Sequence, residues 1–245
     1  MNPELNFVGG DPGAVKYGNF INYYKFHSPE SRIRSLPKNV WKVNENRSLV
    51  CLDVGCNSGE LTGEVYQFLS NCMKERTNSA DFSCHFLAVD LDPVLTSRAR
   101  ESNLHGDNIT YECVDAVGDD ARDKAFADYL GRMGRDRFDV AFCFSVTMWV
   151  HLNHGDEGLQ LFLEGLARWA DTLVIEPQPW KCYRAAVRRL GRHGACFPHY
   201  ESIARRDTLT TIGTLLTEHC HFAEVFRSDP SLWGRTIIIY QKLNC

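Results

Sequence analysis

Strand, turn and helix are encoded together in one segment, Leu49-Val50-Cys51-Leu52-Asp53-Val54-Gly55-Cys56-Asn57-Ser58-Gly59. An apolar run of strand length ends in the pattern Asp-x-Gly-x-x-x-Gly, and an amphipathic stretch from Leu61 to Leu69 follows it directly. We expect Gly55 to let a ligand approach the backbone and Gly59 to let the helix start pack close to the strand. The unpaired N–H groups at the helix start then favour an anionic group.

The rest of the chain alternates strand-like and helix-like stretches, which is the pattern of a mostly parallel sheet with helices on both faces. Seven strands are predicted, at residues 49–54, 85–90, 109–115, 138–144, 173–176, 221–226 and 236–242. Helices are predicted at residues 60–72, 94–103, 121–132, 157–169, 181–191 and 207–219. Only a short turn separates the last two strands, so we expect them to form an antiparallel hairpin.

The glycine pattern is similar to motif I of class I S-adenosylmethionine (SAM)-dependent methyltransferases, in which this loop holds the methionine end of the cofactor. The predicted architecture is also the one that these enzymes use: an α/β, Rossmann-like fold with a mostly parallel seven-stranded sheet and a C-terminal antiparallel hairpin. The fingerprint of the dehydrogenases, Gly-x-Gly-x-x-Gly, is absent. The alternative is an ordinary strand-to-helix turn that contains two glycines.

Three carboxylates, those of Asp53, Asp90 and Asp115, stand at the ends of three successive predicted strands. Ligands of open α/β sheets bind at the carboxyl ends of the strands, so these residues should share one site with the glycine loop. Asp90 is placed to accept hydrogen bonds from ribose hydroxyls. Asp115, or the backbone next to it, is placed to accept a hydrogen bond from the adenine amino group, with Ala116 beside the ring. Each acid taken alone has an alternative as a solvated loop residue.

Composition sets outer limits on function. The chain has 245 residues, 44% of them hydrophobic, which suffices for one large domain over residues 17–245 after a segment, 1–16, that we expect to be flexible. A net charge of −4 requires any polyanion site to be a local patch. The start lacks a signal-peptide layout, and no apolar run approaches membrane-spanning length. We therefore expect a soluble monomer in the cytoplasm, with the nucleus as a second location.

Ten cysteines are present, most of them within apolar strand-like runs, and none forms a Cys-x-x-Cys pair. Buried reduced thiols are the simplest interpretation. A metal site can be imagined from Cys196, His199, His219, Cys220 and His221. Because these residues lack paired ligand spacing, we expect no metal.

A cationic helix is predicted after the fifth strand. Its charged residues, with no acid among them, are Lys181, Arg184, Arg188, Arg189, Arg192 and His193. This stripe is either a solvated face or a binding surface. In the methyltransferase fold, the loops after the fourth and fifth strands border the donor methyl and are expected to shape the acceptor pocket. Beside that pocket the stripe favours a phosphate-bearing acceptor, for which RNA is the natural polyanion. Cys182 is the one candidate for a nucleophilic cysteine on this helix, and we do not assign it that role.

Residues 17–37 are dense in aromatic side chains and end in a short stretch bounded by prolines. The aromatic residues either plug one edge of the domain or form a lid over a phosphate, where tyrosine hydroxyls beside arginines would serve. Composition leaves both alternatives open.

Several motifs together carry a closer resemblance. They are Tyr17-Gly18-Asn19-Phe20, Leu52-Asp53-Val54-Gly55-Cys56-Asn57-Ser58-Gly59, Ser145-Val146-Thr147-Met148-Trp149-Val150-His151-Leu152-Asn153-His154-Gly155-Asp156 and Glu176-Pro177-Gln178-Pro179-Trp180. The set resembles the bicoid-interacting-protein-3 family of RNA 5′-phosphate methyltransferases, and the resemblance covers nearly the whole chain from Tyr17 on. It implies SAM as the cofactor and RNA with a 5′-phosphate end as the partner.

The family has two branches with different acceptors. One methylates the γ-phosphate of an RNA triphosphate. The other methylates the 5′-monophosphate of small structured RNAs, such as histidine tRNA and small-RNA precursors. The compact length, His154 and the run from Trp180 to Ala186 are similar to the second branch. The resemblance therefore implies a 5′-monophosphate acceptor, with the triphosphate as the alternative.

The resemblance also implies a set of cofactor contacts, namely Arg32, Asn57, Asp90, Asp115 with Ala116, and the residue at position 144. These join Asp53, Gly55 and Gly59 from the motif itself. The monophosphate branch has methionine where this chain has Phe144, so the contact there would be packing or backbone only. A contact from Arg32 would make residues 17–37 a lid that folds over the cofactor.

A phosphate oxygen is already anionic at neutral pH, so catalysis of its methylation should rest on positioning and on exclusion of water. We expect Lys181 and Arg184 to clamp the 5′-phosphate and Arg188 to extend the contact. We expect Tyr17, His151 and Asn153 to complete the hydrogen-bond shell, with Lys181, His151 and Tyr17 as catalytic residues. The alternative for His151 is a satisfied histidine that fixes its loop.

Two other classes of protein stay open from sequence. A small-molecule or protein methyltransferase would share the cofactor half of the site but would not need the cationic helix. A non-catalytic RNA-binding scaffold on the same fold would typically have lost the glycine loop or the strand-end acids. All of these are intact here, which favours an enzyme.

Overall fold

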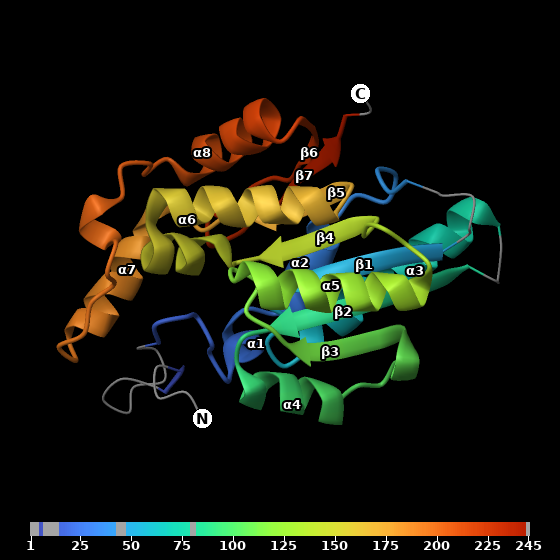
Figure 1. The fold of residues 1–245 in the computed structure, drawn as a ribbon, viewed down its shortest axis with the longest axis horizontal. Helices are drawn as coiled ribbons and strands as arrows, with labels where there is room; N and C mark the ends of the chain where they lie inside the picture. Colours follow the sequence, from blue (N-terminus) through green and yellow to red (C-terminus); the bar gives the residue numbers. More distant parts are fainter. Residues whose placement is uncertain (1–4, 7–14, 43–47, 79–81, 244–245) are drawn as a thin grey trace.

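The computed structural model describes residues 5–6, 15–42, 48–78 and 82–243 (Figure 1). The flexibility that we expect of residues 1–16 falls almost entirely outside these ranges and stays a prediction.

A twisted sheet of seven strands crosses the part of the chain that is described. Its strands are β1 (Ser48–Val54), β2 (Ser83–Asp90), β3 (Ile109–Cys113), β4 (Val140–Phe144), β5 (Thr172–Glu176), β6 (Phe222–Arg227) and β7 (Ile238–Lys242). They lie in the order β3-β2-β1-β4-β5-β7-β6. Strands β1 to β5 pair in parallel, whereas β7 pairs antiparallel with both β5 and β6. The predicted α/β architecture with its C-terminal hairpin is therefore confirmed.

Helices connect the strands and cover both faces of the sheet. They are α1 (Tyr23–Phe26), α2 (Pro29–Ser35), α3 (Glu60–Thr77), α4 (Pro93–Glu101), α5 (Asp119–Met133), α6 (Thr147–Trp169), α7 (Trp180–Gly191) and α8 (Thr208–Thr214), which continues as a π-helix at Leu215–His219. Short 3-10 turns lie at Gly106–Asn108 and Tyr200–Ser202.

Helix α6 differs from the prediction, because it starts at Thr147 rather than at residue 157. Gly155 interrupts it with non-helical dihedral angles, φ 71° and ψ −170°. The kink breaks the helical periodicity of the apolar residues, so the sequence pattern reveals only the second half. The segment expected to be an acceptor loop after β4 is therefore mostly helical.

Strand β1 illustrates how the two faces are filled. Val50, Leu52 and Val54 belong to a cluster formed with α5, α6 and α8. Leu49 and Cys51 belong to a second cluster formed with α2, α3 and α4. This alternation follows the two-residue period of a strand, and it buries the parallel strands on both faces. Figure 1 shows α5 in front of the sheet and α2 behind it.

A third, smaller apolar cluster lies outside the sheet and positions α7. Met148 and Leu152 of α6 pack against Tyr183 and Leu190 of α7 and against Phe197. The cluster holds α7 beside the start of α6, near the carboxyl ends of β4 and β5.

Candidate active site

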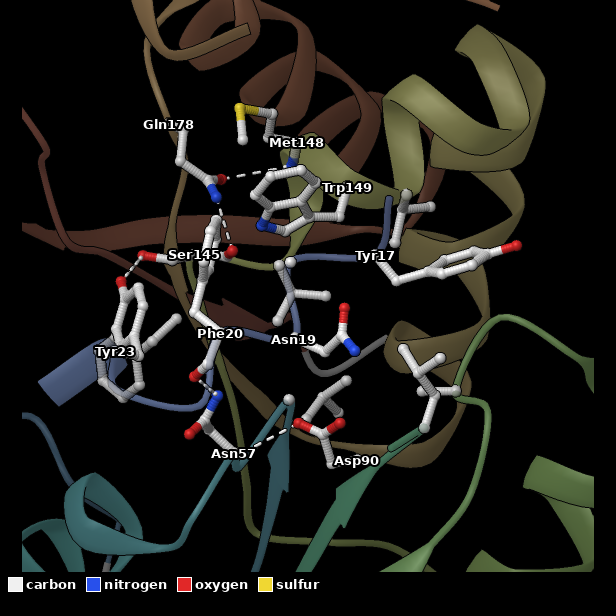
Figure 2. Close-up of a pocket in the computed structure, with 18 of the residues that line it drawn as sticks. Tyr17, Asn19, Phe20, Tyr23, Asn57, Asp90, Ser145, Met148, Trp149 and Gln178 are labelled. Atoms are coloured by element: carbon white, nitrogen blue, oxygen red, sulfur yellow. Dashed lines mark hydrogen bonds between the residues drawn. The ribbon is translucent and has the colours of Figure 1, made fainter. Parts of the chain in front are cut away.

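A cavity of about 720 Å³ opens at the carboxyl ends of the parallel strands. Ligand pockets commonly enclose about 300–1,000 Å³, so this volume suits a nucleoside-sized ligand together with an acceptor group. The sequence-predicted site residues that line the cavity are Tyr17, Arg32, Asp53, Gly55, Asn57, Asp90, Asp115, Ala116 and Phe144. Figure 2 shows several of the lining side chains converging from separate elements.

The loop between β1 and α3 needs glycine at its first and last turns. Gly55 has φ +79°, and a Cβ there would lie 2.4 Å from Cγ2 of Val146. Gly59 has φ +84°, and its Cβ would lie 2.7 Å from the hydroxyl of Tyr111 on β3. Gly55 therefore lies against the start of α6. Gly59 does not line the cavity, and its close neighbour is Tyr111 of β3.

Asp53 and Asp90 are buried carboxyls at this loop. Asp53 accepts a hydrogen bond from Thr62 Oγ1 (2.6 Å). Asp90 accepts from the backbone N–H groups of Asn57 (2.9 Å) and Asp92 (3.0 Å). Burial raises the pKa of each carboxyl to about 6. Both are therefore charged at neutral pH but close to their titration range, where additional donors such as ribose hydroxyls would stabilise the charged form.

The residues after β3 and at the end of β4 line a further part of the cavity. Asp115 is exposed, and its carboxylate accepts from the N–H of Val117 (2.9 Å). Ala116 is buried beside it. Phe144 is also buried, and its ring stacks on Phe142 with centroids 5.7 Å apart. The side chain of Phe144 can therefore contact a ligand by packing and not through a polar group.

The N-terminal segment from Lys16 to Leu36 forms one wall of the cavity. Asn57 Nδ2 donates to the carbonyl of Phe20 (3.0 Å), and the hydroxyl of Tyr23 donates to Ser145 Oγ (3.1 Å), as the dashed lines in Figure 2 show. Asn19 Nδ2 donates to Asp92 Oδ2 (2.8 Å). The segment is therefore fastened to the loops after β1, β2 and β4. Such an arrangement agrees with the predicted lid over residues 17–37, which itself stays a prediction.

Arg32 and Glu176 anchor this wall to the end of β5. Arg32 Nε and Nη2 lie 3.0 and 2.9 Å from the two carboxylate oxygens of Glu176. Ser145, whose φ of 61° is unusual for a residue other than glycine, donates its hydroxyl to the same carboxylate. Arg235, from the turn between β6 and β7, donates through Nη1 to Ser145 Oγ (2.7 Å) and to Tyr23 Oη (2.9 Å). A strained backbone inside a buried polar network is typical of functional sites.

Two unpartnered buried atoms test whether SAM fits. Among the described residues, Arg32 Nη1 has no acceptor and Asn19 Oδ1 has no donor, and both side chains line the cavity. The amino-acid end of SAM carries a carboxylate and an ammonium group, which would satisfy a free donor and a free acceptor. Asp90 would then accept from the ribose, and Asp115 with Ala116 would meet the adenine. The lining residues fit this cofactor.

His151 is not brought to the cavity. Its ring is fully buried, with Nε2 2.7 Å from Asp156 Oδ1 and Nδ1 3.1 Å from the hydroxyl of Tyr183. Burial lowers the pKa of His151, and Asp156 partly offsets this. Asp156 also accepts from the N–H of Ala204. With both ring nitrogens in use, His151 fixes α6 against its neighbours, which favours the alternative stated from sequence.

Asn153 and the predicted phosphate clamp also lie away from the cavity lining. Asn153 Nδ2 donates to the carbonyls of Lys16 and Trp149, both at 2.9 Å. On α7, Lys181, Arg184 and Arg188 are exposed. The cavity is instead lined by three residues of another face of α7, Cys182, Ala185 and Arg189. The helical rotation thus separates the expected clamp from the cavity. Tyr17 lines the cavity, but Figure 2 shows its hydroxyl directed away from Ser145.

Two cations of the cavity wall were not identified as site residues from sequence. Arg189 shares the spacing i, i+3, i+7 with Cys182 and Ala185, so a helical projection would have grouped them. Arg235 follows a turn and carries no periodic signal; only the placement of β7 beside β5 brings it to the site.

Over the described residues, no group of three or more His, Cys, Asp or Glu side chains is placed to hold a metal ion. Within the same ranges no helix has the length and apolar character needed to cross a membrane. The nine cysteines in these ranges are all free.

The fold is the one that the class of SAM-dependent methyltransferases shares. The N-methyltransferase NodS of Bradyrhizobium japonicum, solved with S-adenosylhomocysteine (SAH), aligns with a TM-score of 0.50 and 16% identity over 80% of this chain and 79% of that one. The CurJ carbon methyltransferase aligns with a TM-score of 0.54 and 17% identity over 83% of this chain and 50% of that one. At such identities the likeness establishes the fold.

Sequence comparison narrows the class to a family. The sequence model of Bicoid-interacting protein 3 matches residues 138–242. A pre-miRNA 5′-monophosphate methyltransferase of Xenopus laevis is 41% identical over 242 residues, covering 94% of each chain. An RNA 5′-monophosphate methyltransferase of Bos taurus is 40% identical over 239 residues, covering 94% of this chain and 82% of that one. The chain belongs to the Bicoid-interacting protein 3 family.

Proposed function

We propose that this chain transfers a methyl group from SAM to the 5′-monophosphate of RNA. The observation that carries the proposal is the placement of α7. One face of this helix closes the cavity, and the next face presents Lys181, Arg184 and Arg188 to solvent without an acidic residue on the helix. A polyanion bound along the exposed face would deliver its end to the cofactor cavity.

The relatives support the same acceptor. The similar proteins of Xenopus laevis and Bos taurus are named for methylation of an RNA or pre-miRNA 5′-monophosphate, and they align over almost the whole of this chain. We also propose that the chain acts as a monomer.

SAM, when bound, supplies a methyl group on a positively charged sulfur, and transfer of this group to a phosphate oxygen leaves SAH and a phosphate methyl ester. The attacking oxygen is already anionic, so no residue has to remove a proton. The chain has to orient the phosphate and keep water away. The apolar side chains of Phe144, Met148 and Trp149 line the cavity for the second task.

The body of the RNA would contact the exposed face of α7. Arg206 extends this face, because its guanidinium lies 5.4 Å from the ring centroid of Trp180 at the start of the helix. Contacts of this kind bind backbone phosphates of any sequence and fix the position of the strand. Base-specific recognition would need other parts of the surface.

The test uses purified protein, SAM labelled on its methyl group and one short structured RNA prepared with a 5′-monophosphate, a 5′-triphosphate or a 5′-hydroxyl end. Transfer to the monophosphate form alone is expected. Transfer to the triphosphate form in preference would assign the chain to γ-phosphate methylation. Equal transfer to the hydroxyl form would mean that the acceptor is a base or a ribose. The Asp90→Ala variant, which lacks the expected ribose acceptor, should transfer little label to any of the RNAs.

A further inference from the structure

We propose that Arg189 and Arg235, rather than the exposed cations of α7, bind the 5′-phosphate of the acceptor. This inference rests on the proposed function and names the part of the cavity that reads the phosphate.

Both arginines line the cavity, although they come from different elements. Arg189 lies on α7, and Arg235 lies in the turn between β6 and β7. The side chain of Arg235 is only 10% exposed. In each residue Nε is buried and has no hydrogen-bond partner among the described residues. A buried donor without an acceptor is costly, so two such donors on one cavity point to a ligand that supplies the acceptors.

His27 shows that positive charge is concentrated at this end of the cavity. It also lines the cavity, and its Nδ1 is another buried nitrogen without a partner in the described ranges, beside those of Arg189, Arg235 and Arg32. Burial lowers the pKa of His27 to about 4, and the nearby charges of Arg235, Arg32 and Arg189 contribute to this shift, against the opposing effect of Glu176. His27 is therefore neutral at pH 7, and the guanidinium groups are the cations that remain for an anion.

The charges of this region match a phosphate monoester. Glu176 is already neutralised by Arg32 through two hydrogen bonds. Arg235 donates to the uncharged hydroxyls of Tyr23 and Ser145, and its closest nitrogen lies 3.7 Å from the Glu176 carboxylate. The guanidinium of Arg189 lies over the ring of Phe20 at 5.8 Å. Two guanidinium groups therefore face a monoester whose charge at pH 7 is about −1.5 to −2.

The geometry of guanidinium suits the same ligand. Its N–H groups form a planar fork that binds phosphate oxygens through paired hydrogen bonds. Two forks from different elements would hold the phosphate in one orientation, which methyl transfer requires. A triphosphate end would bring more negative charge than these two groups neutralise. A hydroxyl end would leave both of them unmatched.

The exposed cations of α7 have a different task. Lys181, Arg184 and Arg188 lie in solvent, where they can meet backbone phosphates along the RNA but do not line the cavity. Their contribution should therefore be the same for RNAs that differ only in the terminal group. This difference separates the two sets of residues experimentally.

The test measures the dissociation constants of two RNAs of identical sequence, one with a 5′-monophosphate and one with a 5′-hydroxyl, by calorimetry in the presence of SAH. The quantity of interest is the dissociation constant of the 5′-hydroxyl RNA divided by that of the 5′-monophosphate RNA, which measures the preference for the phosphorylated end. We expect Arg189→Gln and Arg235→Gln each to reduce this ratio by about tenfold or more, as the loss of a charge-assisted hydrogen bond implies. Arg184→Gln and Arg188→Gln should weaken binding of both RNAs by a common factor and leave the ratio unchanged.

Thermal unfolding and SAH affinity establish whether each variant is folded. Arg235→Lys keeps the charge and removes the fork, so it should give a ratio between those of the wild type and Arg235→Gln. If the Arg235 variants do not fold, Arg189→Gln alone decides. The assignment would be overturned if the ratio were unchanged in Arg189→Gln, or if it fell to about one in Arg184→Gln. A ratio near one in the wild-type protein would instead overturn the proposed function.

Discussion

Arg32 and Glu176 form a buried, bidentate ion pair although 144 positions separate them in the chain. Their side chains are 3% and 4% exposed. The pair fastens α2 of the N-terminal segment to the end of β5, and through Ser145 it reaches the end of β4 as well. It thereby holds together two walls of the cavity that no local sequence pattern connects.

Removal of Arg32 should strongly destabilise the protein. Arg32→Ala leaves the Glu176 carboxylate buried without its bidentate partner, with Arg235 Nη1 at 3.7 Å as the cation that remains. Breaking a buried pair costs about 3–5 kcal/mol. We expect a loss of this size in the free energy of unfolding measured by urea titration, together with weaker SAH binding. The control is Arg34→Ala on the same helix, where the exposed pair with Glu30 should contribute little. Equal losses in the two variants would contradict the anchoring role.

The β1–α3 loop predicts a contrast between two glycines. Gly55 and Gly134 both have positive φ, +79° and +63°, but a Cβ collides only at Gly55, since nothing lies within 4 Å at Gly134. Gly134→Ala should cost only backbone strain, about 1–2 kcal/mol. Gly55→Ala should cost more and should also weaken SAH binding, because Val146 or the loop has to move. Calorimetry with SAH and thermal unfolding test the pair; the same SAH affinity in both variants would count against the loop assignment.

The buried carboxyls predict how stability varies with pH. Burial raises the pKa of both Asp53 and Asp90 from 3.8 to about 6. Between these values the folded protein keeps protons that the unfolded chain has released. The contribution of the two carboxyls to the free energy of unfolding is therefore complete below their pKa in the unfolded chain. It is lost as pH rises through their pKa in the folded protein. Urea titrations from pH 4 to pH 7 should show that the free energy of unfolding declines less in Asp90→Asn than in the wild type. An identical profile would refute the shift at Asp90.

Cofactor affinity should depend on pH in the opposite sense. A protonated Asp90 is a poorer acceptor for ribose hydroxyls, so SAH binding should weaken as pH falls through about 6. Titration calorimetry across this range checks the expectation. Asp90→Asn should bind SAH weakly with little dependence on pH in the same interval. A pH dependence that the variant retains in full would have to arise from another group.

His151→Ala tests the structural role that its contacts indicate. The change removes a hydrogen-bond partner from the half-buried carboxylate of Asp156 and from the buried hydroxyl of Tyr183, and an unpaired buried group costs about 1–3 kcal/mol. We expect lower thermal stability and equal effects on RNAs with 5′-monophosphate and 5′-hydroxyl ends. Loss of the preference for the phosphorylated RNA in a folded variant would restore His151 to the phosphate shell.

The cofactor half of the site could be predicted because its signals are local. A strand of apolar residues, two glycines at fixed spacing and an acid at each strand end all lie within short segments, and the parallel order of the strands then gathers them at one edge. Their conformational requirements, such as positive φ at Gly55 and Gly59, also act within the same turn.

The acceptor half could not be predicted in the same way, because it depends on rotation and on long-range pairing. His151 lies in a motif that suggests a loop, but helix α6 begins at Thr147 and turns the ring into the interior. The sequence predicted the row of cations on α7 but not which of them lie at the cavity. The orientation of the helix places Arg189 in the cavity wall and Arg184 in solvent. Arg235 reaches the site only because β7 lies between β5 and β6.

The position of the transferred methyl group tests the central claim most directly. RNA with a 5′-monophosphate would be incubated with the protein and labelled SAM, digested to nucleotides and analysed by mass spectrometry. The account predicts that the label is found on the 5′-terminal nucleotide alone, as a methyl ester of its phosphate, and that RNA with a 5′-hydroxyl yields no labelled nucleotide. Label on a base or a ribose, at the end or within the RNA, would contradict it.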